Sequence, residues 1–282
     1  MRPASLAVIG LGAIGGSLAW QARLAGVARV VGYSPDPADG IEALKAGAIT
    51  ELADSAARAA FGADLVVLAV PPRATLDLLM TLSGRLASGA LLTDVCSVKL
   101  PVVEAARTAG IGDRFAGGHP LAGTHESGFA SARPDRLRGC VVYICESGTR
   151  EGHRAAQRIS GFWEQILDAA PVRISAEAHD RQLAWTSHLP QAVAYALART
   201  LAGQGLGGVS FGAGAKDTTR LAASSPEMWL EIFRYNGPAV AQALERTEAT
   251  LAELRSLLEA EDPSALQSFL ETAQSFRRGL DR

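Results

Sequence analysis

Short apolar runs alternate with amphipathic segments over the first part of the chain. The runs with the length and the valine and isoleucine content of buried strands are Leu6–Ile9, Arg29–Gly32, Leu65–Ala69, Leu91–Val95 and Val141–Ile144, and Pro171–Ser175 resembles a last strand. Apolar residues recur at helical spacing in Ser17–Ala25, Ile41–Ala46, Ala74–Leu86 and Gly152–Leu167. This alternation predicts an α/β domain with a doubly wound, mostly parallel sheet and crossover helices.

Beyond residue 175 the pattern changes to long helices rich in alanine and leucine, interrupted by the glycine-rich stretch Gly203–Gly214 and by Pro263. We therefore predict an N-terminal α/β domain over residues 1–175 and an all-α C-terminal domain over residues 176–282. The segment Val240–Ala260 carries an apolar stripe opposite Glu and Arg, which either covers a core or faces a second subunit. We expect this domain to bind substrate and to form a homodimer.

The composition limits the classes of partner. Lys and Arg total 27 against 29 Asp and Glu in 282 residues, so the charge offers no footprint for nucleic acid or an anionic membrane. A small-molecule substrate is the expected partner. We find neither a secretory signal nor an apolar stretch of membrane-spanning length, and we expect a cytoplasmic protein. The cysteines Cys96, Cys140 and Cys145 lack Cys-x-x-Cys spacing, which predicts reduced thiols and no metal site.

A glycine loop directly follows the first predicted strand and precedes a helix. Gly10 permits a tight turn, Gly12 lets the backbone approach a pyrophosphate, and Gly15 allows the helix to pack closely on the strand. Ala13 and Ile14 complete the loop, and their N–H groups open the helix, where the dipole favours anions. This context predicts a Rossmann-type domain that binds NAD or NADP.

The choice between the two dinucleotides depends on the end of the second strand. NAD-binding sites usually place an acidic residue there for the ribose hydroxyls. Ser34 occupies that position and Asp36 follows closely, so the sequence favours NADP and leaves NAD open. Arg73, after the strand that ends at Val70, is a candidate ligand for a 2′-phosphate.

Two further polar segments follow predicted strands. Thr93–Lys99 is a turn at the carboxyl edge of the sheet, where ligands bind in such folds. Gly117–Thr124 contains His119 between small residues that would leave its ring accessible to a ligand. His119 is our candidate general base, although a histidine before proline is also typical of a packed loop.

Together these segments resemble the prephenate/arogenate dehydrogenase family, which shows a Gly-Leu-Gly-x-Ile-Gly-Gly-Ser loop, a Ser-x-Lys turn and a His-Pro-x-Ala-Gly segment. The similarity continues at Thr186–Pro190 and at Lys216–Trp229, and it spans residues 5 to about 240. Five ordered motifs in two domains are far more specific than one glycine loop. Some relatives also carry a regulatory or a chorismate mutase segment, for which we find no match, so we expect any control by tyrosine to act at the active site.

The resemblance implies oxidative decarboxylation of arogenate or prephenate, in which hydride leaves C4 of the substrate ring for NAD(P)⁺ while carbon dioxide is released. It assigns His119 the acceptance of the C4 hydroxyl proton. It also implies that Ser97 bonds both the substrate hydroxyl and the imidazole, although a helix N-cap is an equally compatible role for Ser97.

The resemblance further implies a set of substrate-binding residues. Arg220 matches the arginine that holds a substrate carboxylate, and His188 matches a histidine that places substrate or packs inside a helix. Thr124 directly follows the His-Pro-x-Ala-Gly segment and is a further candidate for substrate binding. Many prephenate-specific members have a second histidine where this chain has Gln191, a neutral residue that predicts arogenate or dual specificity.

Two rival interpretations share the glycine loop. Dehydrogenases of the 3-hydroxyacid type and imine reductases rely on a helix-borne lysine, for which Lys45, Lys99 and Lys216 are poorly placed. A non-catalytic dinucleotide sensor would have no use for His119, Ser97 and Arg220 together, so their joint presence argues against it.

Overall fold

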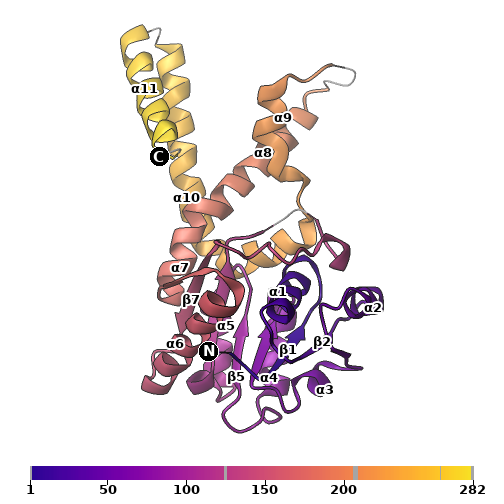
Figure 1. The fold of residues 1–282 in the computed structure, drawn as a ribbon. Helices are drawn as coiled ribbons and strands as arrows, with labels where there is room; N and C mark the ends of the chain where they lie inside the picture. The colour runs from indigo at the N-terminus through magenta and orange to yellow at the C-terminus, as the bar shows by residue number, and fades with distance from the viewer. Residues whose placement is uncertain (1, 124–125, 206–208, 261, 281–282) are drawn as a thin grey trace. The chain divides into compact units, whose positions relative to one another are not determined.

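A computed structural model describes residues 2–123, 126–205, 209–260 and 262–280 (Figure 1). Thr124 lies outside the described residues. The chain divides into two compact units: the first runs to Leu183 and includes Ala223–Asn236, and the second combines Ala184–Ala222 with the chain from Gly237 onward. The boundary expected at residue 175 falls just before helix α7, whereas the compact units divide at the end of that helix.

A five-stranded parallel sheet forms the centre of the first unit, in the order β3-β2-β1-β4-β5. Its strands are β1 (Ser5–Ile9), β2 (Arg29–Tyr33), β3 (Glu51–Leu52), β4 (Leu65–Leu68) and β5 (Leu91–Asp94). The accompanying helices are α1 (Ala13–Leu24), α2 (Pro37–Lys45), α3 (Ala56–Ala60), α4 (Pro72–Leu82) and α5 (Leu100–Thr108). The order of the strands confirms the predicted doubly wound fold and reverses between β1 and β4, where such sheets bind ligands.

A second, three-stranded sheet follows, built from β6 (Ala116–Pro120), β7 (Val141–Glu146) and β8 (Ala170–Arg173). β6 is antiparallel to β7, whereas β8 is parallel to β7. An isolated parallel pairing of Leu92 with Phe115 brings the start of β6 beside β5. His119 thus lies in a strand rather than in a loop, and Cys145 lies in β7 as expected.

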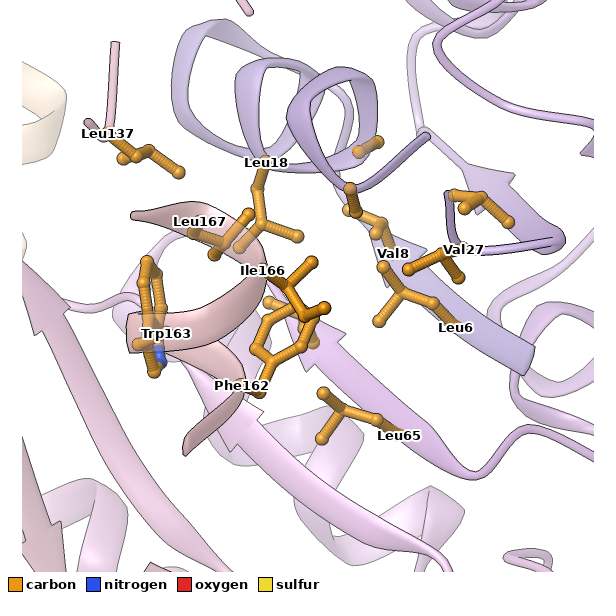
Figure 2. Close-up of a cluster of buried hydrophobic side chains, with 14 of the residues drawn as sticks. Leu6, Val8, Leu18, Val27, Leu65, Leu137, Phe162, Trp163, Ile166 and Leu167 are labelled. Carbon is orange, nitrogen blue, oxygen red and sulfur yellow. The ribbon is translucent and has the colours of Figure 1, made fainter. Parts of the chain in front are cut away.

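The apolar runs that predict strands also form the core. Leu6, Val8 and Leu65 point from the parallel sheet toward Leu18 of α1 and toward the long helix α6 (Arg150–Leu167), as Figure 2 shows. All four side chains are fully buried, as is Trp163 of α6. Burial of each such side chain stabilises the folded state by about 1.5–3 kcal/mol. This core therefore fixes the positions of the strands whose ends carry the polar segments.

The remaining elements are mostly helical. They are η1 (Gly112–Arg114), η2 (Phe129–Ser131), α7 (Ala176–Leu183), η3 (Ala184–His188), α8 (Leu189–Ala202), α9 (Ala213–Thr219), η4 (Arg220–Ala223), α10 (Pro226–Glu259) and α11 (Pro263–Gly279). α10 bends at Asn236, whose backbone is not helical, two residues before Pro238. Proline removes a helical hydrogen bond, which explains the bend. Among the described residues, no helix is long and apolar enough to cross a membrane.

Candidate active site

The glycine loop lies where β1 meets α1 and beside the end of β4. Gly10 has φ +95°, and a Cβ there would lie 2.2 Å from the carbonyl oxygen of Ala69. A Cβ on Gly15 would lie 2.0 Å from the carbonyl oxygen of Gly10. Neither position accepts another residue without moving the backbone, so the loop has the tight form that the motif predicts.

The N-terminus of α1 is built to receive an anion. Gly12 occupies its N-cap and makes no side-chain capping bond, and the first turn holds no acidic residue. In contrast, α2 and α6 are capped by the side chains of Asp36 and Thr149. Among the described residues outside its immediate neighbours, a Cβ on Gly12 would have only the Gly128 nitrogen within 4 Å, at 3.9 Å. Open space above uncapped N–H groups fits the pyrophosphate of a dinucleotide.

The other expected cofactor residues lie around this loop, at the carboxyl edge of the sheet. Ser34 directly follows β2 and is half-buried. Val70 follows β4, and its Cγ1 would lie 2.9 Å from a Cβ on Gly10. Arg73 is exposed in the first turn of α4, where its backbone N–H donates to a carboxylate oxygen of Glu231 at 2.9 Å. An acidic group therefore already occupies the N-terminus of α4.

A buried ion pair lies in the turn between β5 and α5. Lys99 and Asp94 contact each other with fully buried side chains. The Lys99 ammonium also donates to the carbonyl oxygen of Gly118 at 2.6 Å, and the Gly118 N–H donates to Asp94 Oδ1 at 3.2 Å. The ion pair therefore holds both backbone polar groups of Gly118, the residue immediately before His119.

This close approach explains the two glycines before His119. A Cβ on Gly117 would lie 3.2 Å from Lys99 Cδ, and one on Gly118 would lie 2.6 Å from the carbonyl oxygen of Asp94. The second of these distances is too short for any side chain. The glycines thus let β6 lie directly on the Asp94–Lys99 pair.

His119 contacts a second histidine that the sequence analysis missed. His119 Nδ1 lies 2.8 Å from His179 Nε2, and His179 Nδ1 lies 2.7 Å from Asp180 Oδ1. His179 is fully buried, and only 7% of His119 is exposed. The three side chains form a line from helix α7 to the end of strand β6.

The contacts assign the protons on both rings. Burial lowers the pKa of His179, against the opposing effect of its hydrogen bond to Asp180, so this imidazole is neutral near pH 7. Its Nδ1 donates to the carboxylate of Asp180, which leaves Nε2 as an acceptor. His119 must then donate from Nδ1, and its Nε2 carries the lone pair that a general base requires.

Asp180 also caps helix α5. Its carboxylate accepts the backbone N–H of Lys99 at 2.8 Å and that of Leu100 at 2.9 Å. The alternative role of Ser97 as N-cap of this helix is therefore wrong, because Lys99 is the N-cap residue and Asp180 supplies the acceptor. Ser97 lies half-buried in the same turn, between Asp94 and Lys99.

The candidate substrate residues Arg220, His188 and Gln191 belong to the second compact unit. Arg220 is exposed and begins η4, whereas His188 is fully buried at the end of η3. Gln191 is 2% exposed in α8, and its side-chain nitrogen donates to the carbonyl oxygen of Leu221 at 2.6 Å. Gln191 therefore holds the turn in which Arg220 lies.

Sequence reasoning overlooked His179 and Asp180 as site residues. The signal was present, because a histidine followed directly by an acidic residue stands at the start of the helical half of the chain. Their partners, however, lie 60 and 81 residues away along the chain. Pattern alone could not pair them.

Two family models match the chain in order. The nucleotide-binding domain of prephenate dehydrogenase matches residues 18–169, and the dimerization domain of prephenate dehydrogenase matches residues 175–272. The chain belongs to the prephenate dehydrogenase family. It is accordingly an NAD(P)-dependent oxidoreductase, as the five sequence motifs imply.

Individual relatives agree with this assignment. The chain is 32% identical to the prephenate dehydrogenase of Bacillus subtilis, over 98% of this chain and 76% of the relative. The prephenate dehydrogenase of Aquifex aeolicus, solved with hydroxyphenyl propionate and NAD⁺, superposes with a TM-score of 0.89 at 31% identity and covers 98% of each chain. The arogenate dehydrogenase of Synechocystis gives a TM-score of 0.82 at 26% identity, over 98% of this chain and 99% of the other.

Proposed function

We propose that this chain converts arogenate, prephenate or both to tyrosine or 4-hydroxyphenylpyruvate, with His119 as the general base. The observation that carries the assignment to His119 is its contact with His179, which sets the tautomer needed to accept a proton. Family membership supports the reaction, and the open N-terminus of α1 fits the dinucleotide.

The reaction needs a proton acceptor beside a hydride acceptor. Bound NAD(P)⁺ would take hydride from C4 of the substrate ring. His119 Nε2 accepts the proton of the C4 hydroxyl, so the oxygen can form a carbonyl. The ring carboxylate then leaves as carbon dioxide, and the electrons of its broken C–C bond enter the ring and reach the C4 oxygen. That oxygen takes the proton back from His119 to give the phenol of the aromatic product. Ser97, half-buried beside Lys99, would bond the same hydroxyl and limit its orientation.

Three further residues would bind the substrate, as their places in the family motifs imply. Arg220 offers a planar guanidinium suited to a carboxylate, and its exposure leaves it available. His188 and Thr124 are assigned to the substrate by their positions in the family motifs. We assign Arg220 the ring carboxylate, because this group must be oriented when it leaves.

The choice between arogenate and prephenate depends on the side chain attached to the ring. Gln191 is neutral, and its amide nitrogen is engaged by Leu221, so it presents no charge that would select an amino or a keto group. We propose dual specificity on this basis. A Gln191→His variant restores the residue common in prephenate-specific members and should raise the ratio of kcat/KM for prephenate to that for arogenate.

The preference between the two dinucleotides is set by charge near the glycine loop. Ser34 places no negative charge at the end of β2, which favours NADP. Asp39, however, lies in the first turn of α2, five residues after Ser34, and would repel a 2′-phosphate. The two observations act in opposite directions.

We also propose that the protein forms a homodimer through its helical unit. The second family model describes a dimerization domain. In the described part of this unit, large apolar side chains of α10 and α11 are exposed, among them Leu251 at 60%, Leu258 at 59% and Phe276 at 71%. A second copy that covers them would remove this apolar surface from water. Light scattering after size exclusion would give twice the chain mass.

One assay tests the proposed reaction. Purified protein is mixed with prephenate or arogenate and with NAD⁺ or NADP⁺, and the absorbance of the reduced cofactor is followed for all four pairs. We expect turnover with both substrates. Absence of turnover in every pair would reject the proposed function.

A further inference from the structure

A short segment that follows strand β6 packs against α1, the helix that begins at the glycine loop. This crossing segment, Gly128–Arg133, stacks the Phe129 ring on Trp20 at a centroid distance of 5.9 Å. The same ring lies so close to Gly16 that a Cβ there would be 2.6 Å from it. The Arg133 N–H donates to the Ser17 hydroxyl at 2.9 Å, so the segment is attached to α1 at two points.

Asp39 attaches the crossing segment to helix α2. Its Oδ1 accepts the Phe129 N–H at 2.6 Å, and the side chain is half-buried. Gly128 has φ +78°, and a Cβ on it would lie 3.3 Å from the same carboxylate oxygen. The Gly128 nitrogen is in turn the atom that a Cβ on Gly12 would approach. The Asp39 carboxylate therefore contacts the backbone of Phe129, and the neighbouring residue Gly128 lies beside Gly12 of the glycine loop.

A negative charge at this place matters for the cofactor. The adenosine half of a dinucleotide runs from the glycine loop toward the end of the second strand. Ser34 supplies no acid there, but Asp39 lies in the first turn of α2, the helix that follows β2, and its carboxylate contacts the backbone of Phe129. The 2′-phosphate that distinguishes NADP adds further negative charge, which a nearby carboxylate repels.

We propose that Asp39 is the residue that selects the cofactor, and that its anchored carboxylate makes the enzyme prefer NAD⁺ over NADP⁺. The proposal rests on the proposed function and reverses the preference that Ser34 suggests. Asp39 carries the assignment because its hydrogen bond to Phe129 fixes it beside the glycine loop. Asp36, on the same helix, is exposed and caps α2 through the Ala38 N–H at 2.9 Å.

Asp36 therefore provides a matched control. Dissociation constants of NAD⁺ and NADP⁺ are measured by calorimetry, without substrate, for the full-length protein, Asp39→Asn and Asp36→Asn. The Asp39→Asn amide oxygen can still accept the Phe129 N–H, so only the charge is lost. We expect the preference for NAD⁺ over NADP⁺ to fall about tenfold in Asp39→Asn, the size of one charge interaction of about 1.4 kcal/mol, and to change by less than about twofold in Asp36→Asn.

Three results would overturn the proposal: tighter binding of NADP⁺ than of NAD⁺ by the unaltered protein, an unchanged ratio in Asp39→Asn, or the larger change in Asp36→Asn. Amide hydrogen exchange tests the anchor separately. Compared with the unaltered protein, exchange of the Phe129 amide should be faster in Asp39→Ala and similar in Asp39→Asn. Equal exchange rates in Asp39→Ala and the unaltered protein would contradict the hydrogen bond as an anchor. Because substrate is absent throughout, these outcomes are independent of whether the proposed reaction occurs.

Discussion

The Lys99 ammonium lies 2.6 Å from the carbonyl oxygen of Gly118, the residue directly before His119. The backbone N–H of Lys99 also donates to Asp180, the carboxylate that orients His179. One residue therefore supports His119 from two directions, through the peptide of β6 and through the line of side chains from α7. The lysine of the Ser97–Lys99 turn thus helps to position the proposed base.

Replacement of Lys99 by methionine would leave the Asp94 charge buried without its cation. Removal of one partner of a buried ion pair costs about 3–5 kcal/mol, so we expect a loss of this size in the free energy of unfolding. Urea titration followed by circular dichroism would measure it. The exposed Lys45 at the end of α2 provides the control, and Lys45→Met should change stability by less than about 0.5 kcal/mol. A similar small effect for Lys99→Met would contradict the role of the ion pair.

A His119→Asn variant removes the proposed base without removing the strand that carries it. General base catalysis contributes about 10²–10⁴-fold, so kcat should fall by a factor in this range. Cofactor affinity should stay unchanged, because His119 lies in strand β6, whereas the glycine loop lies between β1 and α1. Steady-state kinetics and cofactor titration measure the two quantities. An unaltered kcat would remove His119 from the mechanism.

An Asp180→Asn variant tests the assignment of the protons. An amide nitrogen can donate to His179 Nδ1, which would reverse the tautomer of His179 and place the His119 proton on Nε2. We expect kcat to fall about 10²-fold or more, as the base is then blocked by its own proton. Nitrogen chemical shifts of the imidazoles would report the tautomers directly. The exposed Asp77 of α4 supplies a control, since Asp77→Asn alters a carboxylate outside this line of side chains. Unchanged nitrogen chemical shifts in Asp180→Asn would contradict the assignment of the protons on His179 and His119.

The features that were predictable from the sequence are the local ones. Gly10, Gly12 and Gly15 are close neighbours along the chain, and their meaning depends on backbone geometry within one turn. The apolar runs likewise predict the strands of the parallel sheet, because strands buried on both faces are nearly continuous in apolar residues.

The features that escaped prediction depend on distant contacts or on unusual composition. Strand β6 consists of Ala-Gly-Gly-His-Pro, a composition typical of loops, and it becomes a strand because Gly117 and Gly118 fit against the Asp94–Lys99 pair. Ser97 is a good N-cap by type, yet Asp180 from α7 caps α5 instead. Tertiary contacts of this kind do not appear in the pattern of apolar and polar residues along the sequence.

The burial of His179 predicts a dependence of stability on pH. Its pKa is lower in the folded protein than the ordinary value near 6.5, so the unfolded chain binds the proton more readily. The contribution of this residue to stability is complete above about pH 6.5 and declines as the pH falls toward the folded pKa. Thermal unfolding between pH 5 and 8 should show this decline, and a His179→Gln variant should show a shallower one. Equal slopes in the two proteins would exclude His179 as the source.

The bend of α10 at Asn236 also has a practical consequence for dissecting the protein. The chain passes between the two compact units after Leu183, after Ala222 and at Asn236, so the nucleotide-binding unit is discontinuous in sequence. A polypeptide cut at residue 175 would lack His179, Asp180 and the helical turn in which Asn236 bonds the carbonyl oxygen of Asp180 at 2.8 Å. Such a fragment keeps its glycine loop and lacks the His179 ring that contacts His119, so cofactor binding and chemistry should be separable by truncation alone.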